Sequence, residues 1–174
     1  MSSFGKIPPG GLDRAGFVAR FGGVYEHSAW IAEAVWDAGA LPEGVEALAE
    51  AMAARVEAAG SEAQLALLRT HPDLAGKLAV RGELTAESTS EQAGAGLDHC
   101  SPAEFAEFQR LNGAYTARFG FPFILAVKGY DRAGILEAFR RRAGNDPAAE
   151  FRAALDQVHR IARLRLQALS EETP

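Results

Sequence analysis

Apolar residues recur at helical spacing along almost the whole chain, and this pattern constrains the fold more than any other feature. The clearest helix start is Ser101-Pro102-x-Glu104, which combines an N-cap serine, a first-turn proline and a capping-box glutamate. Further helical patterns are expected over 28–39, 42–60, 61–71, 88–97, 131–139 and 146–166. They predict an all-α, single compact domain of about eight helices over residues 11–174, preceded by a flexible segment over 1–10.

One segment departs from the helical pattern. Phe121-Pro122-Phe123-Ile124-Leu125-Ala126-Val127 is a continuous apolar run that is short and contains a proline. A buried extended segment is therefore expected there. The backbone N–H and C=O groups of such a segment need hydrogen-bond partners, and a bound polar ligand is one way to satisfy some of them.

The composition argues against several classes of function. A net charge of −5, with acidic and basic residues interleaved, does not suit a nucleic-acid surface. No apolar run approaches the ~20 residues of a membrane-spanning helix, and residues 1–6 lack the apolar stretch of a secretory signal. The single cysteine, Cys100, cannot form an internal disulfide, and no histidine or cysteine pair has metal-ligand spacing. We therefore expect a cytoplasmic protein with no metal site and no nucleic-acid or membrane partner.

Two short motifs are the strongest candidates for chemistry. His71-Pro72-Asp73 places an imidazole at the end of one helical pattern, and Ser88-x-x-Glu91 places a carboxylate at the start of another. An unperturbed histidine has a pKa of about 6.5, so such a pair can move a proton near neutral pH. Each motif also has a structural interpretation. His71 can bond the last carbonyls of its helix, and Ser88 with Glu91 has capping-box spacing.

Arg163 is a further candidate, on the last helical pattern and one turn beyond His159. An arginine at this position forms either a surface ion pair or a contact to a carboxylate ligand, which the guanidinium fork matches in geometry. The neighbouring Arg165 is expected to be exposed.

Several motifs, in order along nearly the whole chain, resemble those of the OHCU decarboxylase family. They are FGGVYEHSAW over 21–30, HPDLAGK over 71–77, STSEQ over 88–92 with AGL over 95–97, LNxAY over 111–115, RFGFPFI over 118–124, and Arg140, Asn145 and Glu150 with IAxLRL over 161–166. So many ordered motifs make a chance match improbable. One departure is Ala29, where relatives commonly have a proline, and we expect it to affect only a helix start.

The resemblance implies a cofactor-independent carboxy-lyase of purine metabolism, with an all-helical fold and usually a homodimer. Such an enzyme converts the anionic small molecule 2-oxo-4-hydroxy-4-carboxy-5-ureidoimidazoline into (S)-allantoin during urate degradation. By position in the motifs, His71 is the implied acid–base catalyst and Glu91 the second catalytic residue. The implied substrate contacts are Pro72, Ser88, Gln92, Arg163 and the backbone of Phe121, Pro122, Phe123, Ile124 and Leu125.

Two alternatives stay open at this point. One is a non-catalytic helical binding module with the same fold, and the other is a related lyase acting on another ureido acid. The simultaneous presence of His71, Glu91, Gln92 and Arg163 favours an enzyme, because a module without activity would be free to lose them. The group that delivers the final proton is not identified by the sequence.

Overall fold

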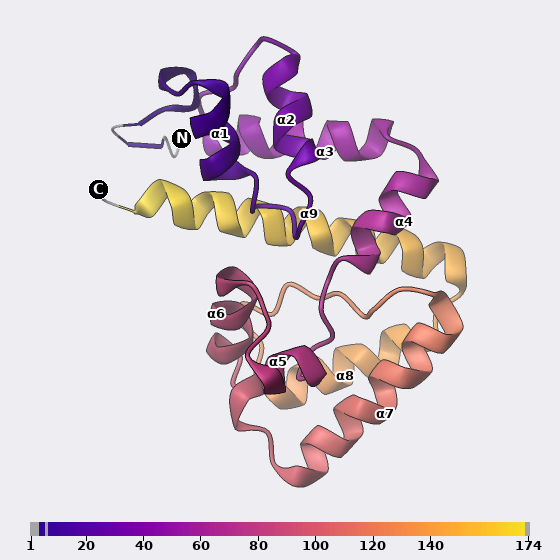
Figure 1. Ribbon diagram of the computed structural model, residues 1–174. Coiled ribbons are helices and arrows are strands. Elements are labelled where there is room, and N and C mark those ends of the chain that lie inside the picture. The colour runs from indigo at the N-terminus through magenta and orange to yellow at the C-terminus, as the bar shows by residue number, and fades with distance from the viewer. Residues whose placement is uncertain (1–3, 6, 173–174) are drawn as a thin grey trace. The chain divides into compact units, whose positions relative to one another are not determined.

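A computed structural model describes residues 4, 5 and 7–172, and helices dominate them (Figure 1). Nine α-helices and two short 3-10 helices occur among these residues, and no strand does. The expected all-α class is confirmed. None of the helices in the described part of the chain is both long enough and apolar enough to cross a membrane.

The chain divides into two compact units. The terminal unit contains the described residues up to Thr70 together with those from Val158 onwards, and the central unit contains His71–Gln157. The last helix, α9 (Pro147–Glu171), contributes its first part to the central unit and the rest to the terminal unit.

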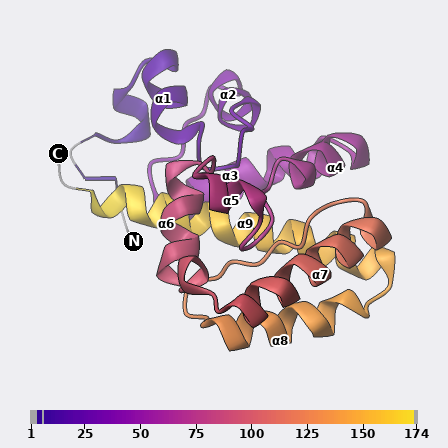
Figure 2. The ribbon, with the colours of Figure 1, turned by 60° about the horizontal axis from the view of Figure 1, so that its bottom comes forward.

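The terminal unit is built from short helices that pack in chain order, α1 against α2, α2 against α3, and α3 against α4 (Figures 1 and 2). Its core contains Phe17, Phe21, Leu48, Met52 and Leu68, all almost completely buried. The elements are the 3-10 helix η1 (Pro9–Gly11), α1 (Arg14–Phe21), α2 (Trp30–Asp37), α3 (Val45–Ala58) and α4 (Ser61–Arg69).

The central unit has α7 and α8 side by side as its largest elements (Figure 2). Its core is aromatic: Phe123 stacks on Phe139 with ring centroids 4.0 Å apart, and Tyr115 packs edge-on against both rings. The elements are α5 (Lys77–Arg81), α6 (Ala86–Gly94), the 3-10 helix η2 (Leu97–His99), α7 (Pro102–Phe119), α8 (Arg132–Ala143) and the start of α9.

Helix starts follow local capping chemistry in most places. The capping box of Ser101 and Glu104 at the start of α7 is confirmed, with the Glu104 N–H donating to Ser101 Oγ at 3.1 Å. Asp131 Oδ1 likewise accepts from the Gly134 N–H at 2.8 Å at the start of α8. Ala29 is the N-cap of α2 and supplies no side-chain cap, so the departure from the family pattern lies at a helix start as expected.

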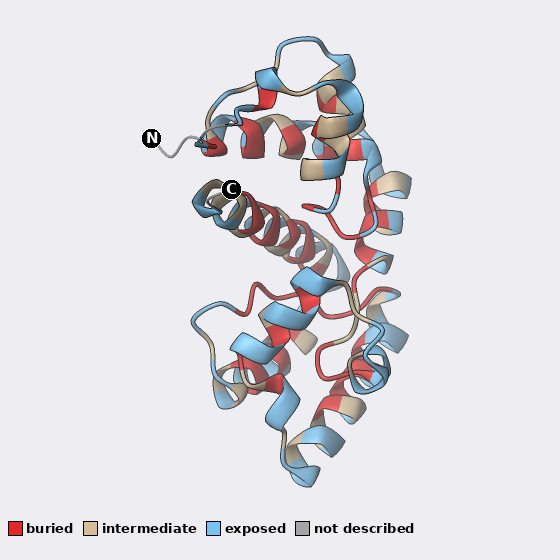
Figure 3. Ribbon diagram, turned by 60° about the vertical axis from the view of Figure 1, so that its left-hand side comes forward, coloured by how far each residue is buried: buried red, intermediate tan, exposed pale blue. Residues whose placement is uncertain are grey.

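The apolar run after α7 is confirmed as a buried, non-helical segment. All residues over 121–127 are buried, and they form the irregular connection that leads towards α8 (Figure 3). The predicted flexible segment over 1–10 is only partly described, because residues 1–3 and 6 lie outside the described residues. Phe4 in that segment is buried, with its ring 5.1 Å from that of Phe21, and the flexibility of the segment stays a prediction.

Candidate active site

His71 stands at the start of the loop that leads into α5. Helix α4 ends at Arg69, three residues before Pro72 and two residues earlier than the helical pattern expected over 61–71. An end before Pro72 agrees with the restriction that a proline places on the residue preceding it. The His71 side chain is buried, with 9 % of the residue exposed. It borders a pocket of about 620 Å³ that lies entirely within the central unit.

The lining of this pocket mixes polar and apolar residues and comes from three places in the central unit. The His71 loop and the start of α5 form one side, α7 forms another, and Pro122 of the buried irregular segment contributes the third. The lining residues are His71, Pro72, Asp73, Lys77, Leu78, Gln109, Asn112, Gly113, Thr116, Ala117 and Pro122. Burial raises the pKa of the Asp73 carboxyl above its usual range.

Gln92 joins the two motifs that carry the candidate chemistry. Its Nε2 donates to the Asp73 carbonyl at 3.3 Å, and its Oε1 accepts from the Ala75 N–H at 3.0 Å. Because Gln92 lies on α6 and both backbone partners follow His71 in the chain, these bonds hold the α6 motif against the His71 loop.

Two further carboxamides, both on α7, bond to the same loop. Asn112 Nδ2 donates to the Leu74 carbonyl at 2.9 Å, and Gln109 Nε2 donates to the Ala75 carbonyl at 2.9 Å. We call Gln92, Gln109 and Asn112 the amide clamp. Asn112 falls within the LNxAY motif, although the sequence assigned it no role, and Gln109 was not singled out at all.

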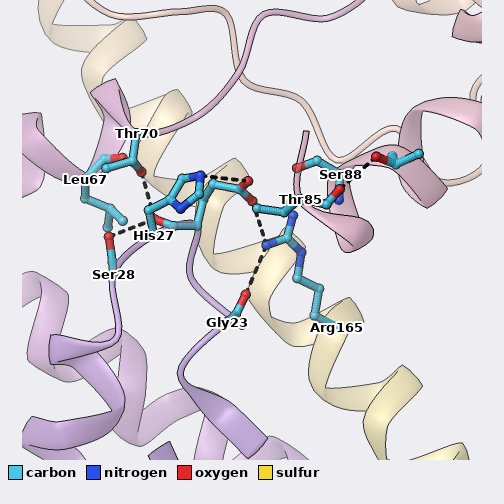
Figure 4. Close-up of polar contacts among 10 residues, drawn as sticks. Gly23, His27, Ser28, Leu67, Thr70, Thr85, Ser88 and Arg165 are labelled. Carbon is cyan, nitrogen blue, oxygen red and sulfur yellow. Dashed lines mark hydrogen bonds and ion pairs between the residues drawn. The ribbon is translucent and has the colours of Figure 1, made fainter. Parts of the chain in front are cut away.

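The capping-box interpretation of Ser88 and Glu91 is wrong. Helix α6 begins two residues before Ser88, and Thr85 is its N-cap: the Ser88 N–H donates to Thr85 Oγ1 at 3.2 Å (Figure 4). Ser88 and Gln92 are buried, while Glu91 is partly exposed. Their spacing of three and four residues places all three side chains on neighbouring parts of one helix face.

The buried segment over 121–127 obtains partners for its backbone from side chains of α8 and α9. Arg142 donates to the Ile124 carbonyl at 2.6 Å, and the Ala126 N–H donates to Gln157 Oε1 at 3.0 Å. The Arg142 guanidinium also lies 4.6 Å from the centre of the Phe123 ring. Arg142 was not singled out from the sequence. Arg140, which was named only as part of the family's C-terminal pattern, forms an exposed ion pair with Glu107.

Arg142 is held by a buried carboxylate. Glu150 is fully buried and accepts from Arg142 Nε at 3.1 Å and from the terminal guanidinium nitrogen at 3.0 Å. The Tyr115 hydroxyl and Asn145 Nδ2 also donate to Glu150. Burial and this carboxylate raise the pKa of Tyr115, so its hydroxyl stays a donor.

Of Arg163 and Arg165, the two arginines of α9 for which the sequence led to an expectation, one differs from it. Arg163 is exposed and forms an ion pair with Glu46 at 3.0 Å, which matches the surface interpretation. Arg165 is buried, contrary to the prediction, with an ion pair to Glu26 at 2.9 Å and a bond to the Gly23 carbonyl at 3.3 Å (Figure 4). It shares the buried face of α9 with Val158, seven residues earlier.

No group of three or more histidine, cysteine, aspartate or glutamate side chains within the described part of the chain is arranged to hold a metal ion. What the structure brings together around His71 is its loop and the side-chain amides of α6 and α7, groups suited to hydrogen bonding beside an imidazole that can transfer protons.

Comparisons with known proteins agree with one another. A family model described as OHCU decarboxylase matches residues 11–167. The chain is 47 % identical over 155 residues to 2-oxo-4-hydroxy-4-carboxy-5-ureidoimidazoline decarboxylase of Haloferax volcanii, covering 89 % of each chain. It is 43 % identical over 158 residues to the same-named protein of Halalkalicoccus jeotgali, covering 91 % of this chain and 87 % of that one.

A solved structure of (S)-allantoin synthase has a TM-score of 0.73 to this chain at 36 % sequence identity. The match covers 91 % of this chain and 51 % of the other, so this chain spans about half the length of that protein. The similarity is therefore to one part of a longer chain.

Proposed function

This chain belongs to the OHCU decarboxylase family, and from that premise we propose that it converts 2-oxo-4-hydroxy-4-carboxy-5-ureidoimidazoline into (S)-allantoin during urate degradation. The observation that supports this most directly is the bonding of Gln92 to the loop that follows His71, beside one pocket of the central unit. Two separate motifs of the family thereby meet in the tertiary structure.

The substrate explains why a carboxy-lyase of this kind needs no organic cofactor. Loss of CO₂ leaves an electron pair that requires an acceptor, which other decarboxylases obtain from groups such as pyridoxal phosphate. In this substrate a C=N bond stands beside the carboxylated carbon and accepts the pair. The protein then has to hold the carboxylate, relay the hydroxyl proton and protonate one face of the ring.

His71 is proposed as the acid–base catalyst and Glu91 as the group that orients it or the ureido arm. General acid–base help contributes about 10²–10⁴-fold, so positioning of the substrate has to supply much of the remaining acceleration. The buried setting of His71 at the edge of the pocket supports this role, because an imidazole there meets a bound molecule away from bulk water.

Ser88, Gln92, Pro72 and the backbone over 121–125 are proposed as substrate contacts. Gln92 uses one N–H and one oxygen lone pair for the loop, and a primary amide has a second N–H and a second lone pair available for a ligand. Pro122 of the backbone segment already borders the pocket beside His71.

Arg163 is proposed to anchor the substrate carboxylate. Its present partner, Glu46, is exposed, with 58 % of its side chain accessible. Exposed ion pairs are worth about 0–1 kcal/mol, so a substrate carboxylate can replace Glu46 at small cost. The buried pair of Arg165 with Glu26 would be far more costly to separate.

We also propose a homodimer in the cytoplasm. The family resemblance supports the dimer, as do the exposed apolar side chains of Leu78 and Val80, which are 44 % and 69 % accessible on α5. Sedimentation velocity tests the dimer: a single species at the mass of one chain across a concentration series contradicts it.

The test of the activity is optical. Freshly prepared substrate with enzyme should give circular-dichroism signals of (S)-allantoin at a rate above that of the spontaneous reaction, and racemic product at the blank rate would reject the assignment. His71→Ala should abolish the enzymatic rate while the helical far-UV spectrum is retained. A panel of other ureido acids distinguishes the related lyase, and substrate binding without turnover would indicate the non-catalytic module.

A further inference from the structure

We propose that Gln109 and Asn112 are positioning residues for His71, acting with Gln92 through the backbone of the loop over 73–75. The inference rests on the proposed function, because it concerns the same site. The hydrogen bonds of Gln92, Gln109 and Asn112 all go to the backbone of this loop. Through these bonds the three residues hold the loop and do not contact the substrate.

The bonding pattern is the first argument. Three successive carbonyls, those of Asp73, Leu74 and Ala75, each accept from a different side-chain amide of the clamp. The carbonyls of an irregular loop have no hydrogen-bond partners in a helix or a sheet. Here the side-chain amides supply those hydrogen bonds. Because the donors come from both α6 and α7, the loop is held from two helices at once.

The loop and the amide clamp each keep one feature that lowers stability. Ala75 has a φ of 49°, in the left-handed region that favours glycine. Asn112 Oδ1 is buried and has no hydrogen-bond partner among the described residues. Strained or unsatisfied groups persist where the surrounding structure holds them, and they concentrate at functional sites.

The clamped loop is joined to the imidazole by a short connection. Pro72 has a φ restricted by its ring, and it is the only residue between His71 and the first clamped carbonyl at Asp73. At the other end, a Cβ at Gly76 would lie 2.6 Å from Asp73 Cβ, so the loop closes tightly. Fixing the loop over 73–75 therefore leaves His71 little freedom to move relative to the pocket.

Gln109→Met and Asn112→Leu test the proposal, because both nearly keep side-chain volume and remove the donor. We expect kcat to fall about 10–100-fold in each, with KM changed less than about threefold, since a displacement of about 1 Å can cost ~10²-fold in rate. Asn112→Leu also removes the unpartnered Oδ1, so its melting temperature should stay within about 2 °C of the wild type.

Gln64→Met is the matched control. Gln64 is a buried carboxamide of the terminal unit that donates to the Val56 and Glu57 carbonyls at 3.1 and 3.3 Å. Its replacement should lower the melting temperature and leave kcat unchanged. A kcat for folded Gln109→Met and Asn112→Leu within twofold of the wild type, or an equal loss of kcat in Gln64→Met, overturns the proposal.

A second readout separates this proposal from the proposed function. NMR of histidine-labelled protein should show the His71 imidazole resonances and titration displaced in Gln109→Met but not in Gln64→Met. That comparison needs no turnover, so it stands even if the wild type fails the decarboxylase assay. Unchanged His71 signals in a folded Gln109→Met would overturn the positioning role whatever the activity.

Discussion

Replacing Glu150 by glutamine tests the buried ion pair that holds the irregular segment. Glu150→Gln keeps the shape of the side chain and removes its charge. Four donors converge on the carboxylate: two nitrogens of Arg142, the Tyr115 hydroxyl and Asn145 Nδ2. An amide has one acceptor oxygen, so its NH₂ group must face at least one of these donors.

The expected loss is large because the partners are buried. Glu150 is fully inaccessible and the Arg142 side chain is 11 % accessible, so the mutation leaves a guanidinium in the interior without its counter-charge. Breaking a buried pair in this way costs about 3–5 kcal/mol. For a chain of this length that corresponds to a fall of roughly 6–20 °C in melting temperature.

Asp156→Asn is the control, because it removes the same charge from an ion pair that is exposed. Asp156 pairs with Arg152 one turn away on α9, with 62 % and 47 % of the two side chains accessible. Its loss should be about 0.3–0.5 kcal/mol. Thermal and urea unfolding of both variants at pH 7, followed by circular dichroism at 222 nm, measures the difference.

Equal losses in the two variants, within about 0.5 kcal/mol, would refute the reasoning that burial decides the value of the pair. The double variant Arg142→Met with Glu150→Leu adds a second test. It removes both charges, so it should recover part of the stability that Glu150→Gln loses. Recovery of stability without recovery of activity would indicate that Arg142 is needed to hold the Ile124 carbonyl in place.

Four further substitutions test separate parts of the structure. Burial raises the pKa of the Asp73 carboxyl above its usual 3.8, because the charged form is disfavoured in the interior. The free energy of unfolding is therefore highest below pH 3.8, where Asp73 is protonated, and it falls as pH rises through the folded-state pKa. Asp73→Asn should therefore raise the melting temperature at pH 7, and the gain should vanish near pH 3; an equal gain at both values contradicts the cause. Ser101→Ala removes the α7 cap and should cost about 1 kcal/mol by urea unfolding, whereas no loss would place the start of α7 under tertiary control. Arg163→Ala should raise KM at least about tenfold without a change in melting temperature, while Arg165→Ala should lower the melting temperature. An unchanged KM for Arg163→Ala removes it from the substrate site.

Helix starts show where local sequence suffices and where it does not. The caps at Ser101 and Asp131 were predictable because donor and acceptor lie three residues apart and no competing cap stands nearby. Before α6 two cap signals overlap, Thr85 three residues before Ser88 and Ser88 three residues before Glu91. The structure uses the first, and Gln92 then faces the His71 loop.

The burial of Arg165 could have been found from the sequence. It lies seven residues after Val158 and three after Ala162, which is the spacing of one helix face, and both of those residues are buried. The charge of the side chain suggested exposure, and the periodicity was the better guide. What the periodicity does not supply is the partner, Glu26, which lies 139 positions earlier in the chain.

The sequence by itself determined the helical class, most helix ends, the buried run after α7 and the family motifs, because each depends on residues within about one or two helical turns. The tertiary structure alone decided that Gln92, Gln109 and Asn112 meet on one loop beside His71. Their partners lie between 17 and 38 residues away along the chain. A side-chain amide has no local preference that selects such a partner, so only the path of the folded chain brings them within hydrogen-bonding distance.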